Sequence, residues 1–216
     1  MIRLRGRLVG LALAALLPAA PVFAQAGADP SVSIRPYVLV SAETFSASKS
    51  FDAVFGTTRG TFLGGGGQVT LGRFFVDVGA SRFEETGERA FAVDDHVFRL
   101  GVPVTVTITP LEFSAGYRAR LRSVPWLVPY AGAGAGTYRY EETSAFAADD
   151  ENLDARATGF LVYGGAEFRL SRWMGMSVDA SYASVGGILG EEGLSGHFAE
   201  DNLGGVAARL RVIVGR

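Results

Sequence analysis

Cysteine is absent from the 216 residues, and this absence excludes several kinds of site at once. The chain cannot form disulfides, thiolate metal sites or a cysteine nucleophile, and it has no cysteine to carry a lipid anchor. Lysine is nearly absent, since Lys49 is the single lysine and every other basic residue is arginine. The formal net charge of -2 gives no basic excess for binding nucleic acid. We therefore predict no nucleic-acid partner and no cofactor.

Long apolar runs are missing too, apart from one near the N-terminus. It covers residues 8–20 and follows three basic residues, Arg3, Arg5 and Arg7. The run is shorter than the ~20 residues of a membrane-spanning helix, so it indicates a secretory signal peptide better than a transmembrane anchor. We predict cleavage after Ala24, with Ala26 as the alternative. The predicted organisation is a signal peptide at 1–24, a short segment at 25–31 and one domain at 32–216.

Period-two alternation of apolar and polar residues dominates the mature chain. In the last such segment Leu210 and Val212 point one way, whereas Arg209 and Arg211 point the other. This pattern is typical of strands with one apolar and one polar face. We predict eight strands, near residues 32–45, 59–72, 74–92, 103–121, 128–142, 157–170, 173–184 and 203–214.

The predicted connections alternate in length. Long polar connections cover residues 46–58, 93–102, 143–156 and 185–203, and short turns lie near residues 72–73, 123–125 and 171–172. This rhythm predicts an all-β, eight-stranded antiparallel up-and-down barrel, with the long loops at one end and the turns at the other. Because Pro110 cannot donate a ladder hydrogen bond, we also predict a bulge at Thr109–Pro110 within one long strand.

The polar face of the predicted strands carries five acids and six arginines, which are Arg35, Glu43, Asp77, Glu112, Arg118, Arg120, Glu167, Arg169, Asp179, Arg209 and Arg211. Alternation alone does not decide which face is inside. The apolar face, however, is free of charge over a membrane-scale stretch, and the signal peptide directs export. Since lipid cannot satisfy backbone groups, the sheet must close, and the charged face then lies inside as a paired network. This predicted network either fills the lumen or lines a narrow path through it.

Aromatic residues gather near the predicted strand ends and support the same interpretation. We expect them to form girdles at the two membrane interfaces, and they are Phe74, Phe75, Trp126, Tyr130, Tyr138, Tyr140, Phe168, Trp173 and Tyr182.

A short motif adds a family resemblance. Residues 128–136, Val-Pro-Tyr-Ala-Gly-Ala-Gly-Ala-Gly, are similar to a Pro-Tyr-x-Gly-x-Gly strand of small outer-membrane barrels of the OmpA, OmpX and OmpW type. The resemblance covers about 30–216 and implies eight antiparallel strands, a periplasmic N-terminus and an outer-membrane location. Two features depart from that group: the last residues given are Gly215-Arg216 instead of an aromatic residue, and we expect no peptidoglycan-binding domain after the last strand.

Four motifs that suggest chemistry have simpler interpretations. Gly64–Gly67 lacks the Lys-Ser/Thr and the helix of a phosphate loop, and we expect these glycines to make room for bulky interior side chains. Residues 150–154 begin like a calcium loop, but Ala155 and Leu161 stand where glycine and glutamate are required. A solvated acidic loop is the better interpretation, with loose binding of divalent cations beside lipopolysaccharide as the alternative.

The pair Ser195 and His197 invites comparison with outer-membrane lipid hydrolases, with Glu200 and Asp201 nearby in sequence. Both residues fall in a predicted loop, and we expect an ordinary exposed segment, as we do for His96. The sequence therefore predicts no catalytic residue and no metal ligand.

The leading functional hypothesis is a non-enzymatic outer-membrane barrel that serves envelope integrity or surface interaction through its extracellular loops. A narrow channel for small or hydrophobic solutes is the first alternative. A lipid-modifying enzyme and a soluble lipocalin-like protein are the others. We expect a monomer whose partners are outer-membrane lipids, lipopolysaccharide and the outer-membrane assembly machinery.

Overall fold

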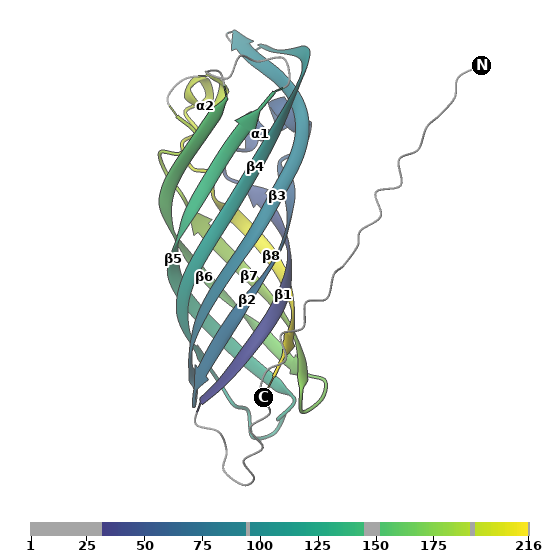
Figure 1. The fold of residues 1–216 in the computed structure, drawn as a ribbon, viewed down its shortest axis with the longest axis vertical. Helices are drawn as coiled ribbons and strands as arrows, with labels where there is room; N and C mark the ends of the chain where they lie inside the picture. The colour runs from purple at the N-terminus through teal and green to yellow at the C-terminus, as the bar shows by residue number, and fades with distance from the viewer. Residues whose placement is uncertain (1–31, 94–95, 145–151, 191–192, 216) are drawn as a thin grey trace, which may run out of the picture. The chain divides into compact units, whose positions relative to one another are not determined.

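The computed structural model describes residues 32–93, 96–144, 152–190 and 193–215. Their elements, in chain order, are β1 (Val32–Phe45), α1 (Ser48–Phe55), β2 (Arg59–Leu71), β3 (Phe74–Val93), β4 (His96–Arg118), β5 (Leu127–Thr143), β6 (Leu153–Arg169), β7 (Met174–Ser184), α2 (Gly193–Phe198) and β8 (Gly205–Val214). Each strand pairs antiparallel with the next, and β8 pairs with β1, so the sheet is a closed barrel (Figure 1). The predicted fold is confirmed. The predicted signal peptide lies outside the described residues.

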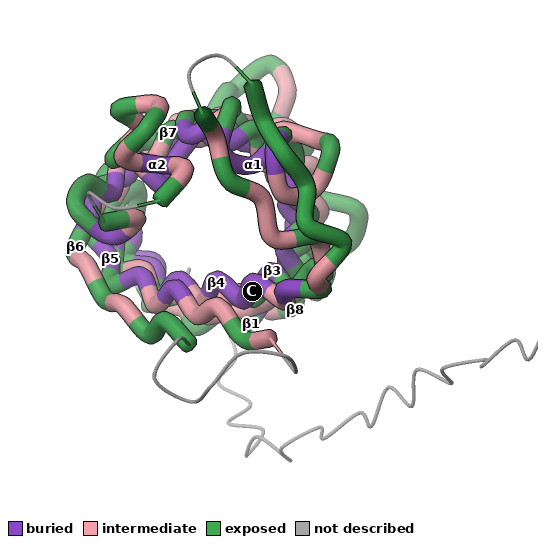
Figure 2. Tube along the Cα trace, turned by 90° about the horizontal axis from the view of Figure 1, so that it is seen from above, coloured by how far each residue is buried: buried purple, intermediate pink, exposed green. Residues whose placement is uncertain are grey.

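The two ends of the barrel differ. The β2–β3, β4–β5 and β6–β7 connections lie at one end, here called the turn end. Both helices and the β3–β4 connection lie at the other, here called the loop end (Figure 1). Figure 2 shows the ring of strands from above, with α1 and α2 near its rim. Both helices are short, and no helix in the described part of the chain has the length and apolar character needed to cross a bilayer.

The predicted division into two faces is observed along the strands. In β8 the side chains alternate strictly between buried and exposed, with Arg209 and Arg211 buried and Leu210 and Val212 exposed. The exposed apolar side chains form a belt around the barrel, which includes Ile34, Val38, Val40, Leu63, Val69, Phe74, Val76, Val78, Leu111, Phe113, Phe160, Val162 and Val178. Apolar residues outside and charged residues inside are the arrangement of a barrel whose solvent is lipid.

The predicted aromatic girdles are only partly correct. Four of the nine residues are buried inside the barrel instead of facing outward, and these are Phe75, Tyr130, Tyr138 and Tyr140. Phe74, Trp126, Trp173 and Tyr182 are exposed, and Phe168 is half-buried. Phe75 shares the strand parity of the inward Asp77, and the three tyrosines share the parity of the buried Val128 on β5. Parity determines the face of a side chain more reliably than closeness to a strand end.

The connection between β3 and β4 is much shorter than predicted. Instead of a loop over 93–102, the two strands continue as a ladder to the pair Val93↔His96. The segment 96–100 contains Val97, Phe98 and Leu100, which favour extended structure over a loop. Two of the other three predicted long connections hold helices, 46–58 α1 and 185–203 α2, and the period-two pattern predicted neither helix.

The predicted bulge at Thr109–Pro110 is wrong. The register between β4 and β5 runs unchanged through Pro110↔Tyr138, and the register with β3 is the same on both sides of it. The irregularity lies instead between Glu88 and Ala90, opposite Gly101, which has a φ of 68°. Glycine adopts this left-handed conformation without a steric cost, so the chain bulges there.

Candidate functional site in the barrel lumen

The first layer of charges, nearest the turn end, centres on Glu167 of β6. Its carboxylate accepts hydrogen bonds from both terminal nitrogens of Arg35 on β1, at 2.6 and 2.9 Å. Arg118 of β4 donates to the same carboxylate at 2.5 Å. All three side chains are buried, and Gln68 accepts a further hydrogen bond from Arg35 at 3.2 Å. One carboxylate therefore ties two arginines from different strands across the lumen.

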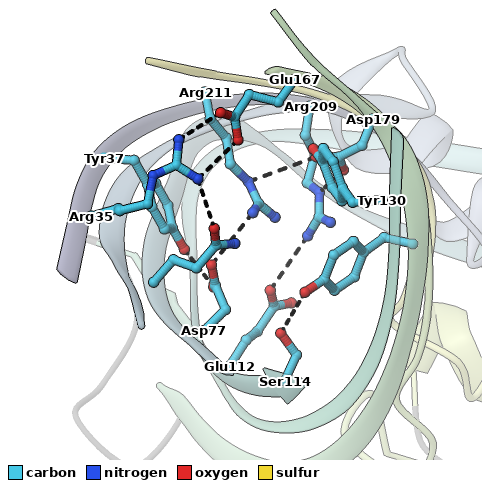
Figure 3. A network of polar contacts seen from close by, with 12 residues as sticks. Arg35, Tyr37, Asp77, Glu112, Ser114, Tyr130, Glu167, Asp179, Arg209 and Arg211 are labelled. Carbon is cyan, nitrogen blue, oxygen red and sulfur yellow. Dashed lines mark hydrogen bonds and ion pairs between the residues drawn. The ribbon is translucent and has the colours of Figure 1, made fainter. Parts of the chain in front are cut away.

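The second layer lies farther from the turn end, between the first and third layers, and centres on Asp179 of β7. Its carboxylate accepts hydrogen bonds from Arg209 at 2.5 Å and from the Tyr130 hydroxyl at 2.6 Å, and Arg211 lies 3.7 Å away. Arg211 also reaches Asp77 on the opposite wall at 3.5 Å. Figure 3 shows these arginines and carboxylates alternating inside the barrel. The alternation neutralises most of the buried charge, as burial of ions requires.

Tyrosine rings fill the space between the ions. Tyr37 donates to Asp77 at 2.7 Å, and the guanidinium of Arg211 lies 5.0 Å from the centre of its ring. Tyr163 lies between two arginines, 4.5 Å from Arg209 and 5.4 Å from Arg211. These distances are those of cation–π contacts, which add to the ion pairs.

Glycine makes room for these rings, as the sequence predicts. A Cβ added to Gly66 or to Gly79 would lie 2.6 or 2.7 Å from the Tyr37 hydroxyl, and one added to Gly132 would lie 2.6 Å from the Tyr163 ring. Any larger residue would displace the ring. Of the predicted tetraglycine, Gly66 serves this purpose directly, whereas a Cβ on Gly67 would meet open space.

The third layer, nearest the loop end, holds Glu112 of β4 and Glu43 of β1. Glu112 accepts a hydrogen bond from Tyr138 at 2.9 Å and lies 3.8 Å from Arg209. Together with Arg209, both glutamates line a small cavity of about 40 Å³ inside the barrel.

Nine of the eleven predicted interior residues point into the lumen, and these are Arg35, Glu43, Asp77, Glu112, Arg118, Glu167, Asp179, Arg209 and Arg211. Arg120 and Arg169 do not join them: both are exposed at the turn end, Arg120 beyond β4 and Arg169 as the last residue of β6. The tyrosines of the network are not among the residues predicted from the sequence. Tyr37 has the same strand parity as Arg35, and this signal was available from the sequence.

An apolar plug lies above the cavity at the loop end. Its buried members come from five strands, from α1 and the residue before it, and from the connection between β7 and β8, and they are Phe45, Ala47, Phe51, Phe62, Phe83, Val106, Ile108, Tyr138, Tyr140, Val185, Ile188 and Leu203. The rings of Phe45 and Phe51 stack at 3.9 Å, which fixes α1 against β1. The lumen thus has an ionic barrier below and an apolar barrier above.

Polar contacts hold α1 at both ends. Glu200, beyond α2, accepts hydrogen bonds from the backbone of Lys49 at 3.0 Å and of Ser50 at 2.9 Å, and from the Ser50 hydroxyl at 2.8 Å. Its carboxylate therefore satisfies free N–H groups of the first turn of α1. Arg99 of β4 donates to the carbonyls of Asp52 and Ala53, in the last turn, at 2.9 and 3.0 Å.

The candidate catalytic pair of the sequence lies on α2. The Ser195 hydroxyl donates to the Leu189 carbonyl at 2.8 Å, and the neighbouring Glu200 is engaged with α1. His96 is the first residue of β4, at the tip of the β3–β4 hairpin, and the centre of its ring lies 6.4 Å from that of Phe98. Neither histidine belongs to a cluster of three or more potential metal ligands among the residues that can be described.

The acidic connection between β5 and β6 is only partly visible, since Asp150 and Glu151 lie outside the described residues. Asp154 accepts two hydrogen bonds from Arg139, at 2.7 and 3.0 Å. These hydrogen bonds lower the pKa of the Asp154 carboxyl below its ordinary value. Asp154 thus has a counter-charge from the neighbouring strand.

Comparison with known proteins agrees with this architecture. The chain matches the Neisserial surface protein A structure with a TM-score of 0.57 at 12% identity, over 85% of this chain and 96% of that chain. It also matches the N-terminal β-barrel domain of Pseudomonas aeruginosa OprF with a TM-score of 0.48 at 14% identity, over 85% of this chain and 97% of that chain. The match to OprG of the same organism has a TM-score of 0.45 at 11% identity, over 86% of this chain and 93% of that chain. No curated protein sequence matches significantly.

The family model for the outer membrane protein β-barrel domain matches residues 10–204, which is most of the chain. The resemblance and the location expected from the sequence are therefore confirmed. The chain belongs to the outer membrane protein β-barrel domain family and is a protein of the bacterial outer membrane.

Proposed function

We propose that this protein is a non-enzymatic barrel with a closed lumen, which acts at the cell surface through its loop end and does not conduct solutes. The observation that carries the proposal is the pair of barriers across the lumen. A solute would have to break the buried ion pairs of Glu167 and Asp179 and then displace the apolar plug. Breaking one buried ion pair costs about 3–5 kcal/mol.

The loop end offers a surface that suits interaction. The ladder of β3 with β2 ends at Leu63↔Arg82, and that of β4 with β5 ends at Thr105↔Thr143. Among the described strands, residues 83–93 and 96–104 therefore pair almost solely with each other. They form a two-stranded ribbon beyond the rest of the sheet (Figure 1).

The tip of this ribbon carries exposed apolar side chains. Arg99 contacts α1, whereas its neighbours Phe98 and Leu100 are exposed. Phe98 stacks on Phe91 at 5.2 Å, and both rings are nearly half exposed, at 48% and 44%. Val93 and Leu100 are exposed beside them. Exposed clusters of large apolar residues mark interaction sites.

A polar collar separates the tip from the membrane belt. Between Ala80 and the tip, the outward residues of β3 are Arg82, Glu84, Thr86 and Glu88, all of them exposed. The hydrocarbon core cannot cover the tip without also burying these charges. The ribbon tip is therefore available to a partner above the membrane.

Adhesion measurements test the surface role. Cells that express the chain in a strain without adhesins of its own are compared with cells that carry the Phe91→Ser/Phe98→Ser double variant. We expect cell–cell aggregation and retention on an apolar surface to fall severalfold. The control is Thr86→Ala/Thr105→Ala, which removes an exposed hydroxyl pair (2.9 Å) lower on the same ribbon and keeps the tip. Equal adhesion of the tip variant and the parent chain at equal surface levels would contradict the role.

The enzymatic alternative lacks support from a specific observation. The Ser195 hydroxyl donates to a backbone carbonyl, and the carboxylate of Glu200 binds the first turn of α1. A nucleophilic serine instead donates its proton to a general base.

A further inference from the structure

The exposed surface of the turn end carries charge of one sign. Its three connections are residues 72–73 between β2 and β3, 119–126 between β4 and β5, and 170–173 between β6 and β7. These connections contain no aspartate and no glutamate, whereas those of the loop end contain acids such as Asp52 and Glu200. Together with the last residue of β6, they carry five exposed arginines, which are Arg73, Arg120, Arg122, Arg169 and Arg172.

Backbone hydrogen bonds bring the three connections side by side. The amide of Arg118 donates to the carbonyl of Arg73 at 2.8 Å, so the β2–β3 turn lies beside the start of the β4–β5 connection. The amide of Arg169 donates to the carbonyl of Trp126 at 2.8 Å, so the end of that connection lies beside the end of β6. The five exposed arginines therefore follow one another along the rim from β2 to β7, and we call them the turn-end arc.

The arginines of the arc have no acidic partners. Within the described part of the chain, none of the five forms an ion pair, and the buried carboxylate of Glu167 is already bound to Arg35 and Arg118. Arg73 donates to the Tyr117 hydroxyl at 3.0 Å, which leaves its charge uncompensated. The positive charge of the arc is therefore available to an anion from outside the barrel.

Exposed aromatic side chains place the arc at the edge of the membrane. Trp126 stacks on Phe168 at 6.1 Å, and Phe168 follows the inward Glu167, so both rings lie on the outer wall. Trp126 and Trp173 are 54% and 55% exposed, and the guanidinium of Arg172 lies 5.6 Å from the centre of the Trp173 ring. Tryptophan on the outer wall of a barrel marks the membrane–water interface. The arginines beside these rings thus lie at the depth of the lipid headgroups.

The chemistry of the arc selects an anionic phospholipid. The short turns of outer-membrane barrels face the periplasm, so the arc meets the phospholipid leaflet of the membrane. A guanidinium binds phosphate oxygens through two parallel hydrogen bonds. The ammonium group of a zwitterionic headgroup finds no carboxylate here and is repelled by the arginines, whereas an anionic headgroup such as that of phosphatidylglycerol is not.

We propose that the turn-end arc is a binding surface for anionic phospholipids. Their phosphate groups are held by the arginines of the arc, and their acyl chains lie against Trp126 and Trp173. This surface goes beyond the proposed function, which uses the opposite end of the barrel. It would fix the depth of the barrel in the membrane and collect anionic lipid around it.

Tryptophan quenching by brominated lipids tests the proposal, because bromine quenches only nearby tryptophans and Trp126 and Trp173 are the two tryptophans of the chain. The full barrel is refolded at pH 7 in vesicles of phosphatidylcholine and phosphatidylglycerol in equal amounts, with bromine on the acyl chains of one lipid or the other. The ratio of the two quenching values gives the relative affinity for the two lipids around the tryptophans. We expect a preference for phosphatidylglycerol of at least about 5-fold, the effect of one basic residue near an anionic membrane surface.

The Arg169→Gln/Arg172→Gln variant should reduce this preference severalfold. The control is Arg59→Gln/Arg156→Gln, which removes the same charge from two exposed positions toward the loop end and should keep the preference. Refolding of each variant is checked by its heat-dependent shift in gel mobility, so that a loss of binding is not confused with a loss of fold.

Three results would overturn the proposal. The first is equal quenching by the two brominated lipids in the parent barrel. The second is a preference that is unchanged in the folded Arg169→Gln/Arg172→Gln variant or reduced equally in the control. The third is loss of the preference on addition of inorganic phosphate but not of sodium chloride at the same ionic strength, because the arc would then bind the free anion instead of the lipid.

Discussion

Arg35 on β1 and Glu167 on β6 are 132 residues apart in the sequence and meet through two hydrogen bonds of 2.6 and 2.9 Å inside the barrel. The two strands are not neighbours in the sheet, so this pair spans the lumen. Arg118 reaches the same carboxylate from a third strand. The proposal of a closed lumen rests on such contacts, because an eight-stranded barrel is only wide enough for its own side chains.

Removing the shared carboxylate of Glu167 tests how much the first layer of charges contributes to the stability of the barrel. Glu167→Ala leaves Arg35 and Arg118 buried without a counter-charge, so we expect the free energy of unfolding to fall by about 3–5 kcal/mol. Urea titration of the refolded barrel in lipid vesicles measures this change. The matched variant Glu84→Ala removes an exposed ion pair with Arg82 and should change stability by less than ~1 kcal/mol. Equal losses of unfolding free energy in the two variants would refute the stabilising role of Glu167.

The contact between Tyr37 and Gly79 permits a double-mutant cycle. A Cβ on residue 79 meets the Tyr37 hydroxyl at 2.7 Å and otherwise only atoms at 3.8 Å. Gly79→Ala should therefore destabilise the barrel by about 1–3 kcal/mol. In the Tyr37→Phe background, which lacks the hydroxyl, most of that cost should disappear. Gly67→Ala, where an added Cβ meets nothing within 4 Å, is the control. Additive effects of the two substitutions would show that the contact is unimportant.

The sequence predicted the sheet better than it predicted the loop end. Strand positions were predictable because a barrel wall forces strict alternation, as in β8, where Arg209 and Leu210 point to opposite sides. Nine inward charges followed from the same parity. Arg120 and Arg169 have the right residue type but lie where the strands end, and there alternation no longer determines the side of the wall.

The network tyrosines and both helices were missed for other physical reasons. Tyr130 was assigned to a girdle because it lies near a strand end, yet it donates to Asp179 inside the barrel. The eight residues of α1 are too few to form a stable helix alone, so its formation depends on contacts such as that of Phe51 with Phe45. Such tertiary contacts leave no periodic signal in the sequence.

Glu200 is predicted to control the order of α1. Glu200→Ala removes the acceptor of the Lys49 and Ser50 amides, so the first turn of the helix should open more often. Hydrogen exchange of these two amides should accelerate by about 10-fold, which corresponds to ~1.4 kcal/mol of lost local stability. Asp201→Asn changes an exposed neighbour and should leave both amides unaffected. Unchanged exchange in Glu200→Ala would show that the apolar plug alone holds α1.

Single-channel conductance of the refolded barrel in a planar lipid bilayer tests the closed lumen most directly. Insertion is counted independently with a fluorescent label on the protein, and a large porin serves as the conducting control. We predict a silent bilayer in 1 M KCl, because the layers around Glu167 and Asp179 and the apolar plug leave no continuous wet path. Reproducible conductance steps whose frequency rises with the number of inserted barrels would contradict the account and favour a channel.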